Sequence, residues 1–188
     1  MATDSEKKQF HQNQSIVKRS IAFAVALLIC SAKATDYIPF PKLHVPTLLD
    51  RVVFALRCSM FSLLAIVIGV QILGSIRFFT TAINPLDSRG KKYAETFERY
   101  LHNTVEQFLI HTFGLLVLST YLSEENMRWV VYLVVWFVIG RVTFLVGYYL
   151  DPMKRGVGFA MNWFANLVVV GYCLYCICVY GVQPLAMN

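Results

Sequence analysis

The sequence predicts an all-α protein that crosses a membrane several times, and two observations carry this prediction. Hydrophobic residues make up 57% of the 188 residues and charged residues only 15%, with a mean hydropathy of +0.55. Typical soluble domains are roughly 45–50% apolar and about 25% charged. Apolar runs long enough to cross a bilayer also recur along the chain, separated by short polar connections. Together these features argue against a soluble globular fold, a disordered chain and a collagen-like chain.

The first 40 residues combine a polar tail with a short apolar segment. Residues 1–20 are polar and lack apolar periodicity, so we expect them to form a flexible tail. Residues 21–40 open with an apolar run that is too short to span a membrane unless it continues through the charged residues that follow. The long polar region before this run favours a signal anchor. A cleaved signal peptide is the alternative, because Ala32-Lys33-Ala34 fits an A-x-A cleavage pattern.

The rest of the chain divides into a connector, four further membrane segments and a stub. Residues 41–51 form the connector, in a proline-rich stretch that cannot be a regular helix. Residues 52–182 hold the four segments, which we expect at 52–79, 94–122, 129–150 and 158–182. The third of these begins in polar sequence and becomes apolar at Phe108, so its first turns should lie at the membrane interface or line a polar cavity. Residues 183–188 remain outside as the C-terminal stub.

Positive residues predict which ends of the segments face the cytoplasm. Lysines and arginines in alternate connections sum to 11 on one side and 4 on the other, and translocation of these residues across a membrane is disfavoured. The side with 11 holds the N-terminus, the region from Arg77 to Arg99 and the turn at Lys154-Arg155. We therefore expect a cytoplasmic N-terminus. We also attribute the net charge of +6 to topology and expect no nucleic-acid partner.

A polar stripe marks the start of the third segment. Arg99, Asn103 and Glu106 follow one another at spacings of four and three residues, which places them within about 60° of one another on a helix. The stripe is either a binding face that enters the membrane or a structural network. In the structural case Arg99 and Glu106 neutralise each other across two turns and Asn103 bridges them.

Arg141 lies near the middle of the fourth segment and requires a partner. An unpaired arginine at that depth costs roughly 2.5–3.5 kcal/mol on insertion scales, and we expect Glu106 to pair with it. Tyr148 and Arg155 follow at intervals of seven residues on the same face, toward the cytoplasmic edge. Arg77, at the end of the second segment, is a further candidate for this edge, although Arg77 and Arg155 taken singly are also explained by the positive-inside rule.

The same residues resemble a known family. The pattern Arg99-x-x-x-Asn103-x-x-Glu106, followed by Arg141, Tyr148 and Arg155, is similar to the MAPEG superfamily, the membrane proteins of eicosanoid and glutathione metabolism. This resemblance extends over residues 52–182. The extra N-terminal segment, with the sequences LRCSMF and VLSTYL, resembles the mattrin branch of that superfamily.

The resemblance implies a four-helix bundle that forms a homotrimer and holds glutathione between neighbouring protomers, near the cytoplasmic face. It implies that Arg99, Asn103 and Glu106 bind the charged ends and the backbone of the peptide, and that Arg141 and Tyr148 contribute from the next helix. Arg155 would stabilise the thiolate and Arg77 would support the site. These implied site residues are therefore Arg77, Arg99, Asn103, Glu106, Arg141, Tyr148 and Arg155. A free thiol, with a pKa of about 8.5, is mostly protonated at neutral pH and needs such a cation.

Departures from the family pattern leave catalysis open. Three positions differ from many glutathione-using members. Leu101 replaces a glutamine, Gln107 replaces a tyrosine, and Phe144 replaces an aromatic residue with a hydroxyl group. One reading is a glutathione-dependent, transferase-like or peroxidase-like enzyme that acts on an apolar, lipid-like electrophile from the bilayer. The alternative is a non-enzymatic, mattrin-like protein of the endomembrane system. Such a protein would act in secretory-pathway trafficking, barrier lipid handling or receptor maturation, with a membrane protein as its partner.

Metal chemistry is not expected from the sequence. Cys173, Cys176 and Cys178 form C-x-x-C-x-C, but no histidine lies near them, so packing or lipidation explains them better than a metal site. His102 and His111 lack a second ligand at i+4 spacing.

Overall fold

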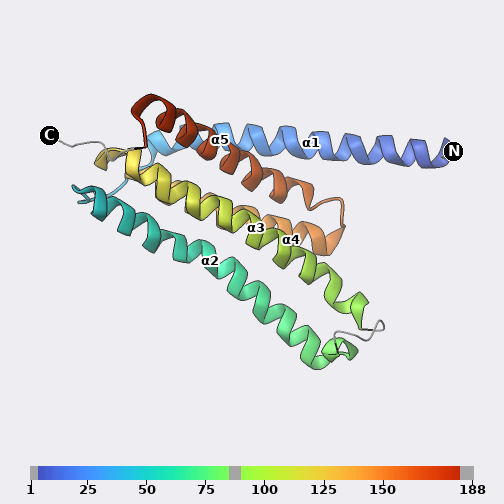
Figure 1. Ribbon diagram of the computed structural model, residues 1–188. Helices are drawn as coiled ribbons and strands as arrows, with labels where there is room; N and C mark the ends of the chain where they lie inside the picture. The colour runs from blue at the N-terminus through green and yellow to red at the C-terminus, as the bar shows by residue number, and fades with distance from the viewer. Residues whose placement is uncertain (1–3, 85–89, 183–188) are drawn as a thin grey trace.

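The computed structural model describes residues 4–84 and 90–182, and their fold is a bundle of five helices (Figure 1). The helices are α1 (Asp4–Ala34), α2 (Leu48–Phe79), α3 (Lys91–Tyr121), α4 (Arg128–Leu150) and α5 (Gly156–Tyr180). The described residues contain no strand. Helices α1, α2, α4 and α5 are long and apolar enough to cross a membrane by length and composition. The all-α membrane bundle that the sequence predicts is confirmed.

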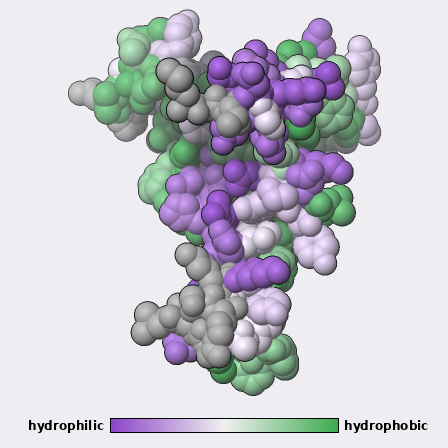
Figure 2. Space-filling view, turned by 90° about the vertical axis from the view of Figure 1, so that its right-hand side faces the viewer, coloured by the Kyte–Doolittle hydropathy of each residue, from purple (hydrophilic) through white to green (hydrophobic). Residues whose placement is uncertain are grey.

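The helices alternate in direction, so the bundle has two chemically distinct ends. One end gathers the start of α1, the connection from α2 to α3 and the turn from α4 to α5 (Figure 1). We call it the Arg155 end. The other end holds the connection from α1 to α2 and a short 3₁₀ turn, η3 (Glu124–Met127), and we call it the Asn126 end. Figure 2 views the molecule from the Arg155 end and shows hydrophilic side chains over much of its centre, with hydrophobic side chains toward the margins.

Helix α1 differs from the sequence prediction. The flexible tail expected for residues 1–20 is wrong for residues 4–20, which form the first half of this 31-residue helix. The helix contains neither proline nor glycine, so no residue breaks it, and acidic residues in its first turn complement the helix dipole. Its N-terminal half projects beyond the other helices (Figure 1). The helix ends at Ala34, before the prolines, and residues 21–40 are therefore not one continuous helix.

Helix α2 begins where its sequence provides a strong start signal. The Thr47 hydroxyl accepts a hydrogen bond from the Asp50 backbone N–H (3.1 Å), and the Asp50 carboxylate accepts one from the Thr47 N–H (3.1 Å). This capping box satisfies two of the free N–H groups at the helix start. In the next position, Arg51 donates to the carbonyl of Leu122, just after α3. The start of α2 is thus tied to the end of α3.

Small residues let the helices approach closely. A Cβ atom on Gly158 of α5 would overlap the backbone nitrogen of Phe144 and would lie 2.6 Å from the carbonyl oxygen of Gly140. The backbones of α4 and α5 are therefore in direct contact at this crossing, as is common between membrane helices. Helix α1 packs on α5 through Ala24, which is fully buried, and through Ser20, which lies against Gly156. These contacts place α1 beside the Arg155 end of the bundle.

Candidate functional site

Three side chains from separate parts of the chain meet at the Arg155 end. The guanidinium carbon of Arg155, directly before α5, lies 4.9 Å from the ring centroid of Tyr148 in α4. The Tyr148 hydroxyl in turn lies close to the Arg99 guanidinium of α3. The Tyr148 ring packs against Phe144, with the ring centroids 5.9 Å apart. The geometry therefore gathers two cations around one phenol, which is an arrangement suited to an anion.

Arg141 lies deeper in the bundle and is completely buried. Its Nη1 donates to Asn103 Oδ1 (2.9 Å), and its Nη2 donates to the backbone carbonyl of Gly158 (3.3 Å). The guanidinium carbon also lies 5.0 Å from the ring centroid of Phe144 and 5.7 Å from that of Phe137. Hydrogen bonds to neutral oxygens and the faces of two aromatic rings thus replace the carboxylate partner.

The ion pair between Glu106 and Arg141 expected from the sequence is wrong. The Glu106 carboxylate instead lies 3.1 Å from His102 Nε2, on the exposed side of α3. The reason is the helical rotation: Glu106 comes three residues after Asn103, which turns it about 60° away from the face that meets α4. The pairing of Arg99 with Glu106 is not formed either, because Arg99 lies 2.5 Å from Glu95.

Arg77 joins the site region only indirectly. Its Nη2 lies 2.7 Å from Glu98 Oε1 of α3. Both side chains are about two fifths exposed, at 42% and 41%. This pair fastens the end of α2 to α3, so the structure gives Arg77 a role in joining helices.

Asn103 and Arg155 line a pocket of about 430 Å³. One wall is aromatic and belongs to α4 and α5, with Phe144, Phe159, Trp163 and Phe164 among its residues. Val17 and Ile21 of α1 also line the pocket. A pocket with one arginine, one amide and a large apolar wall suits a molecule that carries an anionic group next to an apolar part.

Two sets of residues at the site were not predicted from the sequence. Val17 and Ile21 of α1 line the pocket. The sequence predicts a flexible tail at Val17 and a separate membrane segment at Ile21, and neither prediction places α1 beside the site. Buried polar residues also link the helices. Asn166 of α5 donates to the Gln107 side chain (3.1 Å), and Ser62 of α2 lies within hydrogen-bonding distance of His111 (3.1 Å). Gln107 and His111 are four residues apart and therefore share a helix face. This spacing was the signal in the sequence for a polar contact between helices.

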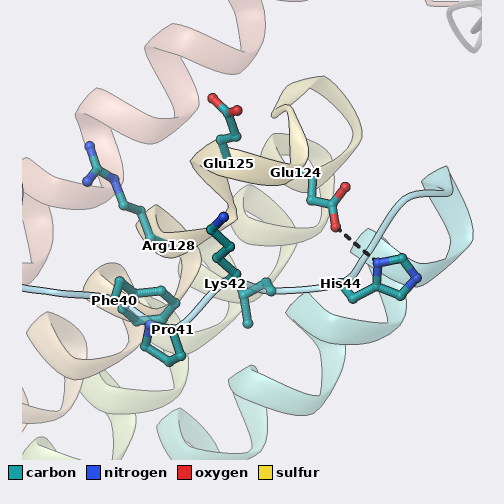
Figure 3. Close-up of a pocket in the computed structure, with 8 residues that line it drawn as sticks. Phe40, Pro41, Lys42, His44, Glu124, Glu125 and Arg128 are labelled. Atoms are coloured by element: carbon teal, nitrogen blue, oxygen red, sulfur yellow. Dashed lines mark ion pairs between the residues drawn. The ribbon is translucent and has the colours of Figure 1, made fainter.

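A second hollow lies at the Asn126 end, where the connector crosses η3 (Figure 3). It measures about 640 Å³. Glu124 organises it: its carboxylate accepts a hydrogen bond from the Val45 backbone N–H (2.9 Å) and lies 3.7 Å from His44 Nδ1. The His44 side chain is 92% exposed. In the described part of the chain no group of three histidine, cysteine or acidic side chains is placed to hold a metal ion. The contacts of Glu124 with Val45 and His44 join the connector to the bundle here.

Comparison with known proteins identifies the family. The MAPEG family model matches residues 52–175, which include most of α2 to α5. This chain belongs to the MAPEG family. Helix α1 precedes the matched region. The MAPEG protein described here therefore adds an N-terminal helix to the matched bundle, and that helix supplies a wall of the pocket at Arg155.

The chain is also similar to curated relatives. It is 29% identical over 161 residues to Transmembrane protein 79 of Mus musculus, an alignment that covers 84% of this chain and 41% of the relative. It is 27% identical over 157 residues to Transmembrane protein 79 of Bos taurus, covering 83% and 40%. The chain thus spans about two fifths of the length of these relatives. No solved structure matches it. The resemblance to the mattrin branch is confirmed by these relatives.

Proposed function

We propose that this MAPEG protein binds a glutathione-type thiol peptide at the Arg155 end. The observation that carries the proposal is the position of Arg155, which lies over the Tyr148 ring and also lines the pocket that it shares with Asn103. Arg99 interacts with the Tyr148 hydroxyl and adds a second cation. Arginine forks bind carboxylates in two-point contacts, and glutathione carries two carboxylates.

Each residue has a distinct role in this proposal. Arg99 binds a carboxylate of the peptide, and Asn103 binds its backbone through its amide. Arg141 is a positioning residue, because it holds Asn103 by a hydrogen bond of 2.9 Å. Arg155 favours the thiolate, which is the nucleophilic form of the sulfur. Each unit by which a thiol pKa falls is worth about 1.4 kcal/mol. An apolar electrophile from the bilayer would lie along the aromatic wall of the pocket, which supports a transferase-like or peroxidase-like reaction.

The proposal includes a homotrimer in the endomembrane system, with the Arg155 end in the cytosol. His102 and Glu106 lie together on the exposed face of α3, where a neighbouring protomer would meet them. Glu106 would then reach the peptide across the protomer contact. The distribution of 11 positive residues on one side and 4 on the other supports a cytoplasmic N-terminus. Reduced glutathione is available on that side of the membrane.

Thermal unfolding of the detergent-purified protein with and without reduced glutathione tests the proposal. A ligand at about 100 times its dissociation constant adds ~2.7 kcal/mol to the free energy of unfolding. We expect reduced glutathione to raise the Tm and Arg155→Ala to abolish the rise. Lys154→Ala is the matched control, because it removes a neighbouring cation that does not line the pocket, and it should keep the rise. An unchanged Tm of the wild-type protein would contradict the proposal.

A second candidate function is favoured by the ion pairs at this end. Arg77, Arg99 and Glu106 each have a partner within the chain, in Glu98, Glu95 and His102. Charged side chains that are already paired within the chain have a structural role in this reading and are not available to bind a ligand. The protein would then be a non-enzymatic, mattrin-like membrane protein that acts through a protein partner in trafficking, barrier lipid handling or receptor maturation. An intact trimer whose Tm does not respond to glutathione would favour this function over the first.

A further inference from the structure

A separate pocket opens at the Asn126 end, on the far side of the bundle from Arg155. It measures about 420 Å³ and lies where α1, α3, α4 and α5 meet. Aliphatic and aromatic side chains form most of its wall. The polar residues among those that line it are Asn126, Trp129, Tyr132 and Tyr172. No charged side chain belongs to this wall among the residues that the structure describes. A pocket of this size and composition suits a small apolar ligand with one polar group.

The pocket begins at the membrane surface and ends within one leaflet. Glu124, Glu125 and Arg128 mark the surface, because charged side chains avoid the hydrocarbon core. The part of the lining that η3 and α4 contribute runs from Asn126 to Leu133. At the rise of a helix, seven residues span about 10 Å. The depth of the pocket is therefore less than half of the ~30 Å hydrocarbon core. The ligand therefore keeps its polar group near Asn126 and buries its apolar body below it.

The polar end of the pocket is neutral. Asn126 offers both a donor and an acceptor. Arg128, the nearest cation on the same turn, is held by Asp36, with its Nη2 3.0 Å from the Asp36 carboxylate. Its charge is therefore paired with a carboxylate, which weakens its attraction for an anionic headgroup. This chemistry fits a hydroxyl group better than a carboxylate or a phosphate.

The shape of the pocket favours a rigid ligand over a flexible chain. A volume of about 420 Å³ spread over a depth of about 10 Å corresponds to a mean width of about 7 Å, which is wider than a single extended acyl chain. A flexible acyl chain would have to fold to fill it and would lose conformational freedom, whereas a fused-ring body is ordered before it binds. Aromatic side chains form part of the wall, with the Trp129 and Tyr132 ring centroids 5.5 Å apart.

Helix α1 completes this pocket and is fixed in place there. Leu28 and Ala32 of α1 line it, and Ser31 between them lies 2.8 Å from the Tyr132 hydroxyl of α4. That hydrogen bond holds α1 against the matched MAPEG bundle. We propose that the pocket binds a sterol, with its hydroxyl at Asn126 and its ring system between α1, α4 and α5. The site is independent of the glutathione-type site at the opposite end.

A photoreactive cholesterol analogue tests the proposal on the full chain in phosphatidylcholine nanodiscs. We expect crosslinks to map to residues 28–32 and 126–133, and excess unlabelled cholesterol to suppress them. Val168→Phe should lower crosslinking about tenfold, which corresponds to a tenfold loss of affinity, because the new ring fills the pocket from a position that is 63% exposed. Leu167→Phe is the matched control, since Leu167 is similarly exposed (52%) but does not line the pocket.

Three results would overturn the sterol site. These are equal crosslinking in wild type and Val168→Phe, crosslinks that cholesterol does not suppress, and stronger labelling of the same peptides by a photoreactive fatty acid. The Tm of each variant shows whether it is folded. Should Val168→Phe not fold, Leu28→Phe fills the pocket from α1. Leu27→Phe is then the control, because Leu27 is exposed and does not line the pocket.

Discussion

Arg141 shows how a buried cation is accommodated in this protein without a carboxylate. Its charge is spread over a planar guanidinium, which is less strongly hydrated than an ammonium group. Asn103 and the Gly158 carbonyl accept its hydrogen bonds, and two phenylalanine rings present their faces to it. The contrast with Arg57 is informative. Arg57 also lies inside a membrane helix but is exposed on the surface of α2.

The two arginines give a matched pair of substitutions. Arg141→Met should lower the free energy of unfolding by about 2–4 kcal/mol, because leaving a buried polar group unsatisfied costs about 1–3 kcal/mol and two acceptors lose their donor. Arg57→Met should change it by less than about 0.5 kcal/mol, as is usual at exposed positions. Unfolding by denaturing detergent in mixed micelles measures both. Equal losses in the two variants would contradict the role assigned to Arg141.

At the scale of helices, the contact between α4 and α5 depends on the absence of a side chain at one position. Gly158→Ala should lower the free energy of unfolding by about 1–3 kcal/mol, the usual cost of overpacking, because the new Cβ would overlap the backbone of α4. Gly171→Ala, on the same helix, should raise it by about 0.5–1 kcal/mol, since alanine is the better helix former and its Cβ meets nothing within 4 Å. The same detergent titration reports both. A stabilising Gly158→Ala would show that the backbones are not in contact.

Helix α3 shows how far the sequence determines a site. The spacing of Arg99, Asn103 and Glu106 correctly predicts a polar stripe, because relative angles on a helix follow from sequence alone. The sequence does not determine which side of the stripe faces α4. Packing decides this: Tyr100, Thr104 and Gln107 are buried on the adjoining face. Asn103 therefore reaches Arg141, while Glu106 is rotated toward the exposed side.

Helix α1 shows the complementary difficulty. Composition separates polar from apolar residues, and the first 20 residues of this chain are polar. Whether a segment forms a helix depends instead on the absence of proline and glycine over a long stretch. The contacts of α1 with α5 through Ala24 and Ser20 are tertiary, and no local pattern in the sequence predicts them. The pocket at Arg155 and the pocket at Asn126 each have a wall on α1, and the sequence did not predict that contribution.

At the scale of the whole molecule, the five helices run in alternating directions (Figure 1), and four of them are long and apolar enough to cross a membrane. We therefore expect the two ends of the bundle to lie on opposite sides of the membrane. This arrangement assigns the exposed Lys92, at the start of α3, to the Arg155 end. It assigns the exposed Lys42, in the connector, to the Asn126 end. Cysteines placed at these two positions therefore report the orientation.

A membrane-impermeant maleimide should distinguish the two positions in sealed microsomes whose cytoplasmic face is outward. The five natural cysteines are first replaced by alanine so that each variant carries one thiol. Lys92→Cys should react directly, because the excess of positive residues predicts that the Arg155 end lies in the cytosol. Lys42→Cys should react only after detergent opens the vesicles. The reverse labelling pattern would show that the protein has the opposite orientation in the membrane. The Arg155 site would then be out of reach of cytosolic glutathione. Direct reaction of both thiols would mean that α2 does not cross the membrane, because this helix separates the two positions in the bundle.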